Sequence, residues 1–308
     1  MASLKELTQR PELLSPGHRM CAGCGAPVAI RQILKAVEGP VVIGCATGCL
    51  EVATTIYPFT AWRASFIHSA FENSAATISG VEAAYRALLR KGKAPEGYRF
   101  IAMGGDGGTY DIGFQSLSGA MERGHRMVYV CYDNEAYMNT GIQRSSATPR
   151  WADTTTSPAG RVVPGKPVHR KDLTAIMAAH HIPYVAQASP SHWNDLFTKA
   201  QRALNADGPA FLNVLAPCPR GWRTDPAESI EMARLAVETC YWPLFEVVEG
   251  KYRITFRPKE KRPLVDWLKP QGRFKHLFTP ERKHLLDDLQ QRVDRDWEEL
   301  EWLSRAAR

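Results

Sequence analysis

The chain has 308 residues, of which 44% are hydrophobic and 23% charged, with a formal net charge of +7 at pH 7 and a pI near 9.0. This length and composition are those of a globular protein with a substantial core, and no apolar run reaches the roughly 18 residues that a membrane helix needs. The basic residues are dispersed and form no stripe interleaved with aromatic residues, which argues against nucleic-acid binding and equally fits an acidic protein partner.

The chain opens on a polar stretch, residues 1–7, without the charged and then apolar pattern of an export signal. Seven cysteines in such a chain favour free thiols or metal ligation over a disulfide scaffold. We therefore expect a cytoplasmic protein that neither binds nucleic acid nor enters a membrane.

Helical and strand patterns alternate along the first two thirds of the chain. Apolar spacing predicts helices over residues 26–38, 74–90, 114–124, 173–180 and 192–205. Short apolar runs predict strands over residues 40–45, 98–103, 127–132, 184–186 and 210–215, and the polar stretch 139–166 is expected to be a loop. This alternation predicts an α/β fold, a doubly wound parallel sheet with helices on both faces.

The pattern changes from about Asp225. A helix is expected to about residue 239, followed by a hairpin-like segment over 245–256. Residues 281–308 carry apolar side chains at helical intervals in a highly charged sequence, which predicts an amphipathic helix that docks on a neighbour. We therefore divide the chain into a cofactor-binding domain, residues 1–224, and a C-terminal appendage, residues 225–308, with no independent core.

Two predicted strands end in polar residues that suit a diphosphate and its cation. Gly105-Asp106-Gly107 follows one strand, and Asn134 follows the next. Mg²⁺ takes carboxylate and amide oxygens, and ligands of parallel sheets bind beyond the carboxyl ends of the strands. Gly105, Gly107 and Gly108 allow the backbone to approach phosphates, and a helix that starts near Phe114 can offer unpaired N–H groups. Two unrelated turns are the alternative interpretation.

Cys21 and Cys24 form a CxxC turn that suits a zinc knuckle, a redox dithiol or two ligands of an iron–sulfur cluster. A loop, residues 15–20, precedes the turn where a thioredoxin-like protein needs a strand. Cys49 and Cys218 complete a set of four that serves zinc or a [4Fe-4S] cluster alike by count, although the second CxxC of a zinc ribbon is missing. We expect the remaining cysteines to be core or surface thiols and the loop histidines to be neither ligands nor bases: Cys45, Cys131, Cys240, His18, His68 and His169.

Four motifs occur in order, over residues 21–25, 44–49, 105–113 and 133–143. They read Cys-Ala-Gly-Cys-Gly, Gly-Cys-Ala-Thr-Gly-Cys, Gly-Asp-Gly-Gly-Thr-Tyr-Asp-Ile-Gly and Asp-Asn-Glu-Ala-Tyr-Met-Asn-Thr-Gly-Ile-Gln. With these motifs, and further likeness over residues 267–278, the chain resembles the β subunit, or thiamine-diphosphate-binding subunit, of the pyruvate:ferredoxin oxidoreductase family and its 2-oxoacid relatives. The resemblance implies the thiamine-diphosphate-binding fold, with thiamine diphosphate, Mg²⁺ and a [4Fe-4S] cluster as cofactors.

The resemblance also implies roles for individual residues. The cluster would be held by Cys21, Cys24, Cys49 and Cys218. Mg²⁺ would be bound by Asp106, Asn134 and the carbonyl of Ala136. The cofactor would further contact Thr47, Gly105, Gly107, Gly108 and Asn139, with Asn139 and Thr140 against the reacting centre.

The implied reaction is the oxidative decarboxylation of pyruvate to acetyl-CoA and CO₂, with electrons passed through the cluster to ferredoxin. The implied partners are α-, γ- and δ-type subunits of one complex, ferredoxin, the 2-oxoacid and coenzyme A. The activating glutamate is expected on a partner chain, since Glu51 and Glu72 are interpreted as structural or solvated, so this subunit alone should be inactive. Further clusters must lie on another subunit, because the chain has no Cys-x₂-Cys-x₂-Cys run.

Three alternatives stay open at this point. Relatives of the same architecture act on oxalate, 2-oxoglutarate or other 2-oxoacids, although residues 139–149 look most like those of pyruvate-type members. A non-redox thiamine-diphosphate decarboxylase or synthase would keep Asp106 and Asn134 but has no use for four thiols. A zinc-stabilised interaction module leaves the spacing between these two residues unexplained.

Overall fold

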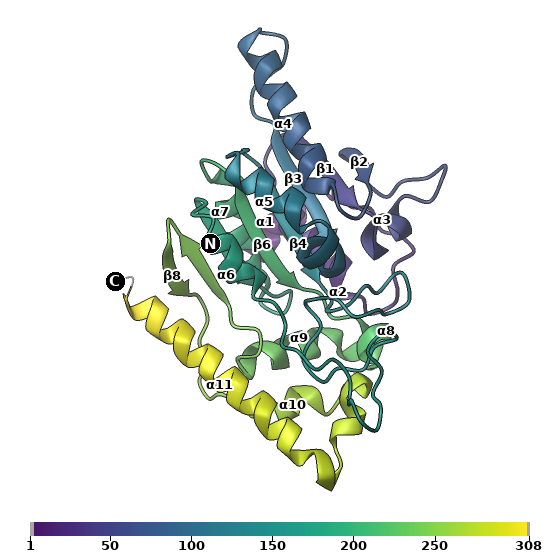
Figure 1. Cartoon of the computed structure of the whole chain (residues 1–308). Helices are drawn as coiled ribbons and strands as arrows, with labels where there is room; N and C mark the ends of the chain where they lie inside the picture. Colours follow the sequence, from purple (N-terminus) through teal and green to yellow (C-terminus); the bar gives the residue numbers. More distant parts are fainter. Residues whose placement is uncertain (1–2, 307–308) are drawn as a thin grey trace.

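A computed structural model describes residues 3–306. Its strands are β1 (Val41–Ala46), β2 (Ser65–Ser69), β3 (Arg99–Gly105), β4 (Val128–Asp133), β5 (Tyr184–Ala188), β6 (Ala210–Leu215), β7 (Phe245–Val248) and β8 (Lys251–Ile254). They form one eight-stranded sheet in the order β2-β1-β3-β4-β6-β5-β7-β8. All neighbours from β2 to β5 pair in parallel, and β7 and β8 are added as an antiparallel hairpin (Figure 1).

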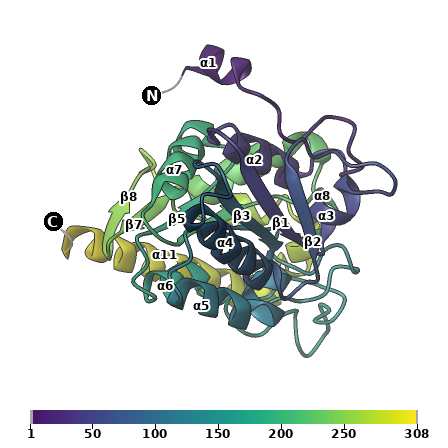
Figure 2. The same cartoon turned by 90° about the horizontal axis from the view of Figure 1, so that it is seen from above.

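Helices cover both faces of the sheet (Figure 2). Alternate residues of each strand point to opposite faces, so Val41 and Ile43 of β1 join one apolar cluster and Val42 joins another. The first cluster lies under α2 (Gly25–Leu34) and α7 (Trp193–Asn205). The second lies under α4 (Ser74–Arg90), α5 (Phe114–Glu122) and α6 (Leu173–Ala178). The predicted α/β, doubly wound fold is therefore confirmed.

The remaining elements are short, apart from the last helix. They are α1 (Leu4–Gln9), α3 (Cys49–Thr54), the π-helix η1 (Gly107–Ile112), α8 (Pro219–Trp222), η2 (Pro226–Glu228), α9 (Ser229–Glu238), α10 (Val265–Leu268), η3 (Gly272–Leu277), η4 (Pro280–Arg282) and α11 (Lys283–Ala306). Of these, α9 and α11 were predicted. None of the helices within residues 3–306 combines the length and the apolar character needed to cross a membrane.

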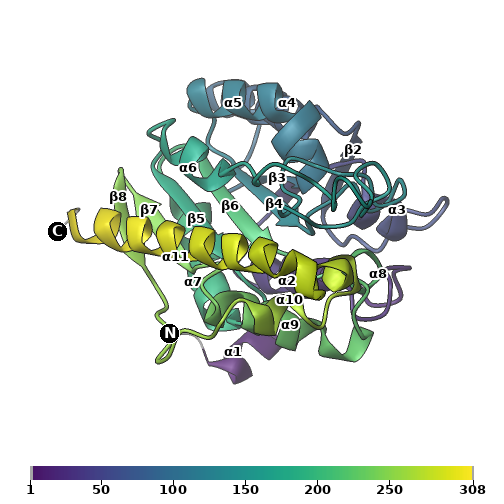
Figure 3. The same ribbon diagram turned by 60° about the horizontal axis from the view of Figure 1, so that its bottom comes forward.

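The predicted hairpin of the C-terminal part is confirmed, with its turn at Glu249 and Gly250, which have φ values of 50° and 79°. Strand β7 pairs with β5, so the hairpin extends the main sheet. Helix α11 runs along the carboxyl edge of the sheet (Figure 3). Its apolar face, which was expected to dock on a neighbour, instead packs within the chain through Leu285, Leu289, Val293 and Leu300. The division at residue 225 and subunit docking by the rest of the tail stay predictions.

Candidate active site

The residues of the predicted diphosphate signature lie at the carboxyl edge of the sheet, where β3 and β4 end side by side. The two strands run parallel with Gly105 paired to Tyr132, so the residues after them leave the sheet at the same level. The backbone N–H of Asn134 donates to Asp106 Oδ1 over 3.2 Å. The structure thus brings together two residues that are 28 positions apart in the chain.

Two polar groups, the Asn134 amide and the Ala136 carbonyl, converge beside the Asp106 carboxylate. One terminal atom of the Asn134 amide lies 2.9 Å from Asp106 Oδ1 and 2.8 Å from the carbonyl oxygen of Ala136. As the amide nitrogen, this atom donates to both oxygens. With the amide turned over, three oxygens face one another, an arrangement that a cation between them would stabilise. Octahedral Mg²⁺ with oxygens at about 2.1 Å has neighbouring oxygens about 3 Å apart, so this set of atoms fits the ion.

The Asp106 carboxylate has no exposed surface, and its direct donors are neutral. Oδ1 accepts from Asn134, and Oδ2 accepts from Ser145 Oγ over 2.5 Å. Burial raises the pKa of Asp106 well above its usual value, and the nearby Asp133 carboxylate raises it further, against the two hydrogen bonds. A bound cation would supply the positive charge that this carboxylate lacks.

One pocket gathers nearly all of the residues predicted to contact the cofactor. Thr47, Gly105, Gly107, Gly108, Asn134, Ala136, Asn139 and Thr140 all line it, and Asp106 is buried beside it. The rest of the lining is Gly48, Cys49, Phe71, Tyr132, Tyr137 and Met138. Asn139 and Thr140 are the exposed members of this set. No carboxylate is among the lining residues in the described part of the chain.

The backbone after Asp106 differs from the prediction. The helix expected near Phe114 is α5, but η1 precedes it, so helical backbone begins at Gly107, next to the carboxylate. Unpaired N–H groups of a first helical turn therefore lie at the pocket itself. A Cβ on Gly107 would come within 2.4 Å of the Tyr137 ring, so close packing requires glycine here.

The four predicted cluster cysteines lie near one another, and one of them, Cys49, lines this pocket. The turn of Cys21 and Cys24 is held by the hydrogen bond from Gly25 N to Pro217 O, 2.9 Å long, which places it beside Cys218. Cys24 caps the N-terminus of α2, and Cys218 caps that of α8. Cys49 begins α3 and lines the pocket. Cys21 is exposed, and the other three thiols are half-buried.

The electrostatics of these thiols reflect their proximity. Burial raises the pKa of Cys24 to about 12, and Cys218, Cys49 and Cys21 add to the rise. Burial also raises the pKa of Cys49 to about 12, with contributions from Cys218 and Cys21. Within residues 3–306, no three His, Cys, Asp or Glu side chains are close enough to hold a single metal ion. Cys24 thus has the other three cysteines near enough to disfavour its ionisation.

The structure also places the cysteines, the glutamate and the histidine that were not assigned to the site. Cys45, Cys131 and Cys240 are buried core thiols, as predicted. Glu51 is also buried, and its Oε1 accepts from Thr55 Oγ1 of the same helix end. His68 lies within hydrogen-bonding distance of Thr47 Oγ1, 2.8 Å away.

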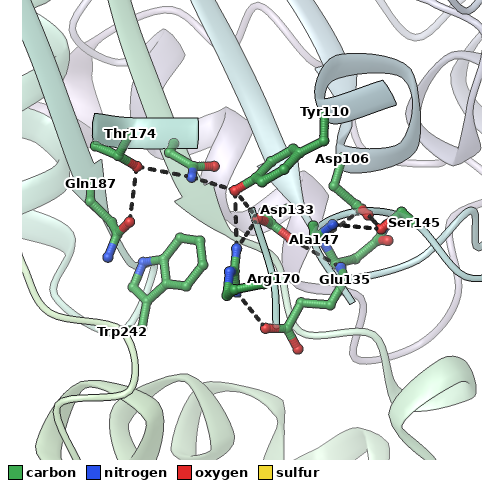
Figure 4. Close-up of polar contacts among 12 residues, drawn as sticks. Asp106, Tyr110, Asp133, Glu135, Ser145, Ala147, Arg170, Thr174, Gln187 and Trp242 are labelled. Carbon is green, nitrogen blue, oxygen red and sulfur yellow. Dashed lines mark hydrogen bonds and ion pairs between the residues drawn. The ribbon is translucent and has the colours of Figure 1, made fainter. Parts of the chain in front are cut away.

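A buried ionic network next to Asn134 was not predicted (Figure 4). Arg170 Nη2 donates to Asp133 Oδ2 over 2.6 Å, and its Nη1 donates to Glu135 Oε1 over 2.8 Å. Tyr110 Oη also donates to Asp133 Oδ2, over 2.7 Å. Asp133 and Glu135 flank Asn134 within the motif over residues 133–143, so the sequence could have indicated that they belong to the site. Neither Arg170 nor Ser145 carries any such signal in the sequence.

Comparison with known proteins gives the family. The profile of "Thiamine pyrophosphate enzyme, C-terminal TPP binding domain" matches residues 42–214, which include both the Gly-Asp-Gly and the asparagine. Pyruvate synthase subunit PorB of Thermotoga maritima is 53% identical over 308 aligned residues, covering 97% of this chain and 95% of that protein. This chain belongs to the PorB family.

Not every relative of this PorB-family chain bears that name. Ketoisovalerate oxidoreductase subunit VorB of Pyrococcus furiosus is 45% identical, covering 94% of this chain and 92% of its own length. Among solved structures, 2-oxoglutarate:ferredoxin oxidoreductase from Magnetococcus marinus has a TM-score of 0.53 over 72% of this chain and 79% of that chain. At 19% identity, this likeness shows the fold alone.

Proposed function

We propose that this chain is the thiamine-diphosphate-binding subunit of a 2-oxoacid:ferredoxin oxidoreductase of the pyruvate synthase type. The observation that carries the proposal is the single pocket in which the signature residues meet, with Asp106, Asn134 and the Ala136 carbonyl converging at its base. Thiamine diphosphate is the cofactor because the matching family model is that of a domain that binds it.

Mg²⁺ would be held by Asp106, by the side-chain oxygen of Asn134 and by the carbonyl oxygen of Ala136. Support comes from the spacing of these atoms and from the buried carboxylate without a cationic partner. The diphosphate would lie against the backbone of Gly107 and Gly108, where η1 begins and the N–H groups of its first turn can face an anion.

A [4Fe-4S] cluster would be held by Cys21, Cys24, Cys49 and Cys218. In such a cluster each thiolate binds its own iron, and support comes from the proximity of Cys24 to Cys218, Cys49 and Cys21. Three of the thiols stand at helix N-termini, whose partial positive charge favours thiolate. Thiolate ligation to iron would offset the unfavourable effect of burial on ionisation.

Thiamine diphosphate supplies the carbanion chemistry that decarboxylates a 2-oxoacid, and an iron–sulfur cluster accepts electrons singly. Asn139 and Thr140 are exposed at the pocket, where Asn139 can donate a hydrogen bond to an oxygen of the substrate. The pocket has no carboxylate in its described lining, which supports an activating glutamate supplied by a partner subunit.

The chain acts as part of a multi-subunit complex, in keeping with its place among proteins named as subunits. Its proposed partners are α-, γ- and δ-type subunits, a ferredoxin, coenzyme A and the 2-oxoacid. Pyruvate is the proposed substrate because a pyruvate synthase subunit is 53% identical over 97% of this chain. A branched 2-oxoacid is the second candidate, because a ketoisovalerate oxidoreductase subunit is 45% identical.

The test is anaerobic purification of the native complex, followed by iron, sulfide, magnesium and thiamine-diphosphate analysis. Reduction of a ferredoxin or viologen is then measured with pyruvate, 2-ketoisovalerate, 2-oxoglutarate and oxalate, with and without coenzyme A. We expect four irons per copy of this chain beyond those of the other subunits, and the fastest reduction with pyruvate and coenzyme A. Zinc in place of iron, or a complex without thiamine diphosphate, would refute the proposal.

A further inference from the structure

Glu135 stands between two of the proposed magnesium ligands, Asn134 and Ala136. Its backbone has a φ of 69°, in the left-handed region that residues other than glycine rarely adopt. This local turn directs the Asn134 amide and the Ala136 carbonyl toward the same point. A backbone conformation of this kind persists only where the surroundings hold it in place.

The carboxylate of Glu135 is held by charged and polar donors, of which Figure 4 shows Arg170. The glutamate side chain has no exposed surface. Oε1 accepts from Arg170 Nη1 over 2.8 Å and from Tyr241 Oη over 2.5 Å, and Oε2 accepts from Arg273 Nη2. Arg170 also binds Asp133, on the other side of Asn134. The carboxylate is therefore fixed from two sides by guanidinium groups.

These donors come from segments distant in the sequence. Arg273 and Tyr241 both belong to the C-terminal appendage, and Arg273 is 138 residues from Glu135. Arg273 lies over the Trp222 ring, 4.4 Å from its centroid, and Trp222 Nε1 donates to the carbonyl oxygen of Asn134 over 3.0 Å. The appendage thus contacts the side chain of residue 135 directly, and through Arg273 it packs on Trp222, which holds the backbone of residue 134.

We propose that Glu135 is a positioning residue, fixed by Arg170 and Arg273, that sets the affinity of the site for Mg²⁺ and the diphosphate. The C-terminal appendage is then part of the cofactor site, through Arg273. The inference rests on the proposed function, since it concerns the same magnesium ligands. Residues that orient metal ligands typically change metal affinity or activity by about 10- to 100-fold when they are replaced.

The chain offers a matched control for a purely structural role. Glu246 in β7 is likewise fully buried, with Arg202, Arg253 and the Tyr184 hydroxyl as its donors. It has the same kind of partners as Glu135, but β6 and β5 separate its strand from β4. Neither Glu246 nor any of its partners lines the cofactor pocket.

The experiment compares Glu135→Gln with Glu246→Gln in the whole complex, stripped of cofactor with a chelator. Binding of thiamine diphosphate is measured by equilibrium dialysis over a series of MgCl₂ concentrations, together with Tm and iron content. We expect Glu135→Gln to raise the Kd for thiamine diphosphate at fixed MgCl₂ by roughly 10- to 100-fold, with iron retained. Glu246→Gln should lower Tm and leave this Kd unchanged.

Arg273→Lys and Arg273→Met provide an independent pair if Glu135→Gln does not fold. The lysine retains a positive charge, so it should recover part of the affinity that the methionine loses. The positioning role alone is overturned if Glu135→Gln, or both Arg273 variants, bind the cofactor with unchanged affinity while their Tm falls as in Glu246→Gln. A wild-type complex that binds no thiamine diphosphate overturns the proposed function as well.

Discussion

Asp106 is a buried carboxylate whose hydrogen-bond donors, Asn134 and Ser145, carry no charge. Burial of a charge is costly unless a partner of opposite sign compensates it. Elsewhere in the chain, buried Glu246 and Glu135 each have two arginine partners. The contrast explains why a cation is expected at Asp106 and not at the other two.

We predict that Asp106→Asn weakens retention of thiamine diphosphate at least tenfold, about 1.4 kcal/mol, because it removes the charged group proposed to bind Mg²⁺ but keeps the shape of the side chain. The measurement is cofactor and iron content after gel filtration of the complex. Asp195→Asn, which removes the partner of buried Lys199, is the control for general destabilisation. Equal loss of iron and cofactor in Asp106→Asn would indicate misfolding instead of a lost ligand.

The buried lysine Lys166 leads to a prediction about the pH dependence of thermal stability. Its Nζ donates to the carbonyls of Ser146 and Thr148, next to the serine that binds Asp106, and burial lowers its pKa to about 7. In the unfolded chain the lysine keeps its proton up to a pH of about 10.4. Below pH 7 both states carry the charge, so the folded state bears the full free-energy cost of burying it. Between pH 7 and about 10.4 the folded state loses the proton first, and the free energy of unfolding rises with pH. The Tm of the wild type relative to Lys166→Met should therefore increase from pH 7 to pH 10. A constant or decreasing difference would contradict this assignment.

At the scale of elements, the site depends on the close approach of the CxxC turn to the segment after β6. A Cβ on Gly25, the first residue of α2, would lie 2.5 Å from Pro217 Cδ and 2.7 Å from Pro217 N. The distance between Cys24 and Cys218 is therefore set by a contact that only glycine permits.

We predict that Gly25→Ala moves these two cysteines apart and lowers iron content at least twofold, with smaller losses of thiamine diphosphate, because overpacking of a close contact shifts the backbone. Gly80→Ala in α4 is the matched control, since a Cβ there meets nothing within 4 Å. Its effect should be neutral or slightly stabilising, as alanine favours helix. Iron and sulfide analysis of both variants decides the question, and full iron content in Gly25→Ala would refute the prediction.

The long strands and helices were predictable because their apolar periodicity reflects burial, but other elements were not. Strand β2 is an edge strand whose residues alternate little in polarity, and its central Phe66 and Ile67 are only partly buried. The loop over residues 139–166 is polar in sequence, yet Ser145, Thr148 and Lys166 are buried in it. Such polar burial depends on hydrogen-bond partners that periodicity does not reveal.

At the scale of the whole molecule, the predictable part of the site is the part carried by neighbouring strands. Asp106 and Asn134 could be paired from the sequence because ends of parallel strands share one edge of the sheet. Arg170 and Arg273 could not, since they reach Asp133 and Glu135 over sequence separations of 37 and 138 residues. Only the folded chain shows that the C-terminal part reaches the loop around Asn134.

We predict that the isolated chain, even when supplied with thiamine diphosphate and MgCl₂, shows no detectable viologen reduction with pyruvate and coenzyme A. The reason is the lack of a carboxylate in the described lining of the pocket. Addition of the other subunits should restore turnover. Turnover by the isolated chain would show that it supplies its own activating acid, and Glu51→Gln and Glu72→Gln would then identify it.

The four thiols do not face the same surroundings: Cys49 lines the pocket, whereas Cys21 reaches the surface on the CxxC turn. Cys21, Cys24, Cys49 and Cys218 would hold the proposed cluster between the cofactor pocket and the molecular surface. It would supply one-electron transfer, with the substrate on the side of Cys49 and the surface on the side of Cys21. A redox partner that takes up the electrons should therefore bind near the exposed CxxC turn.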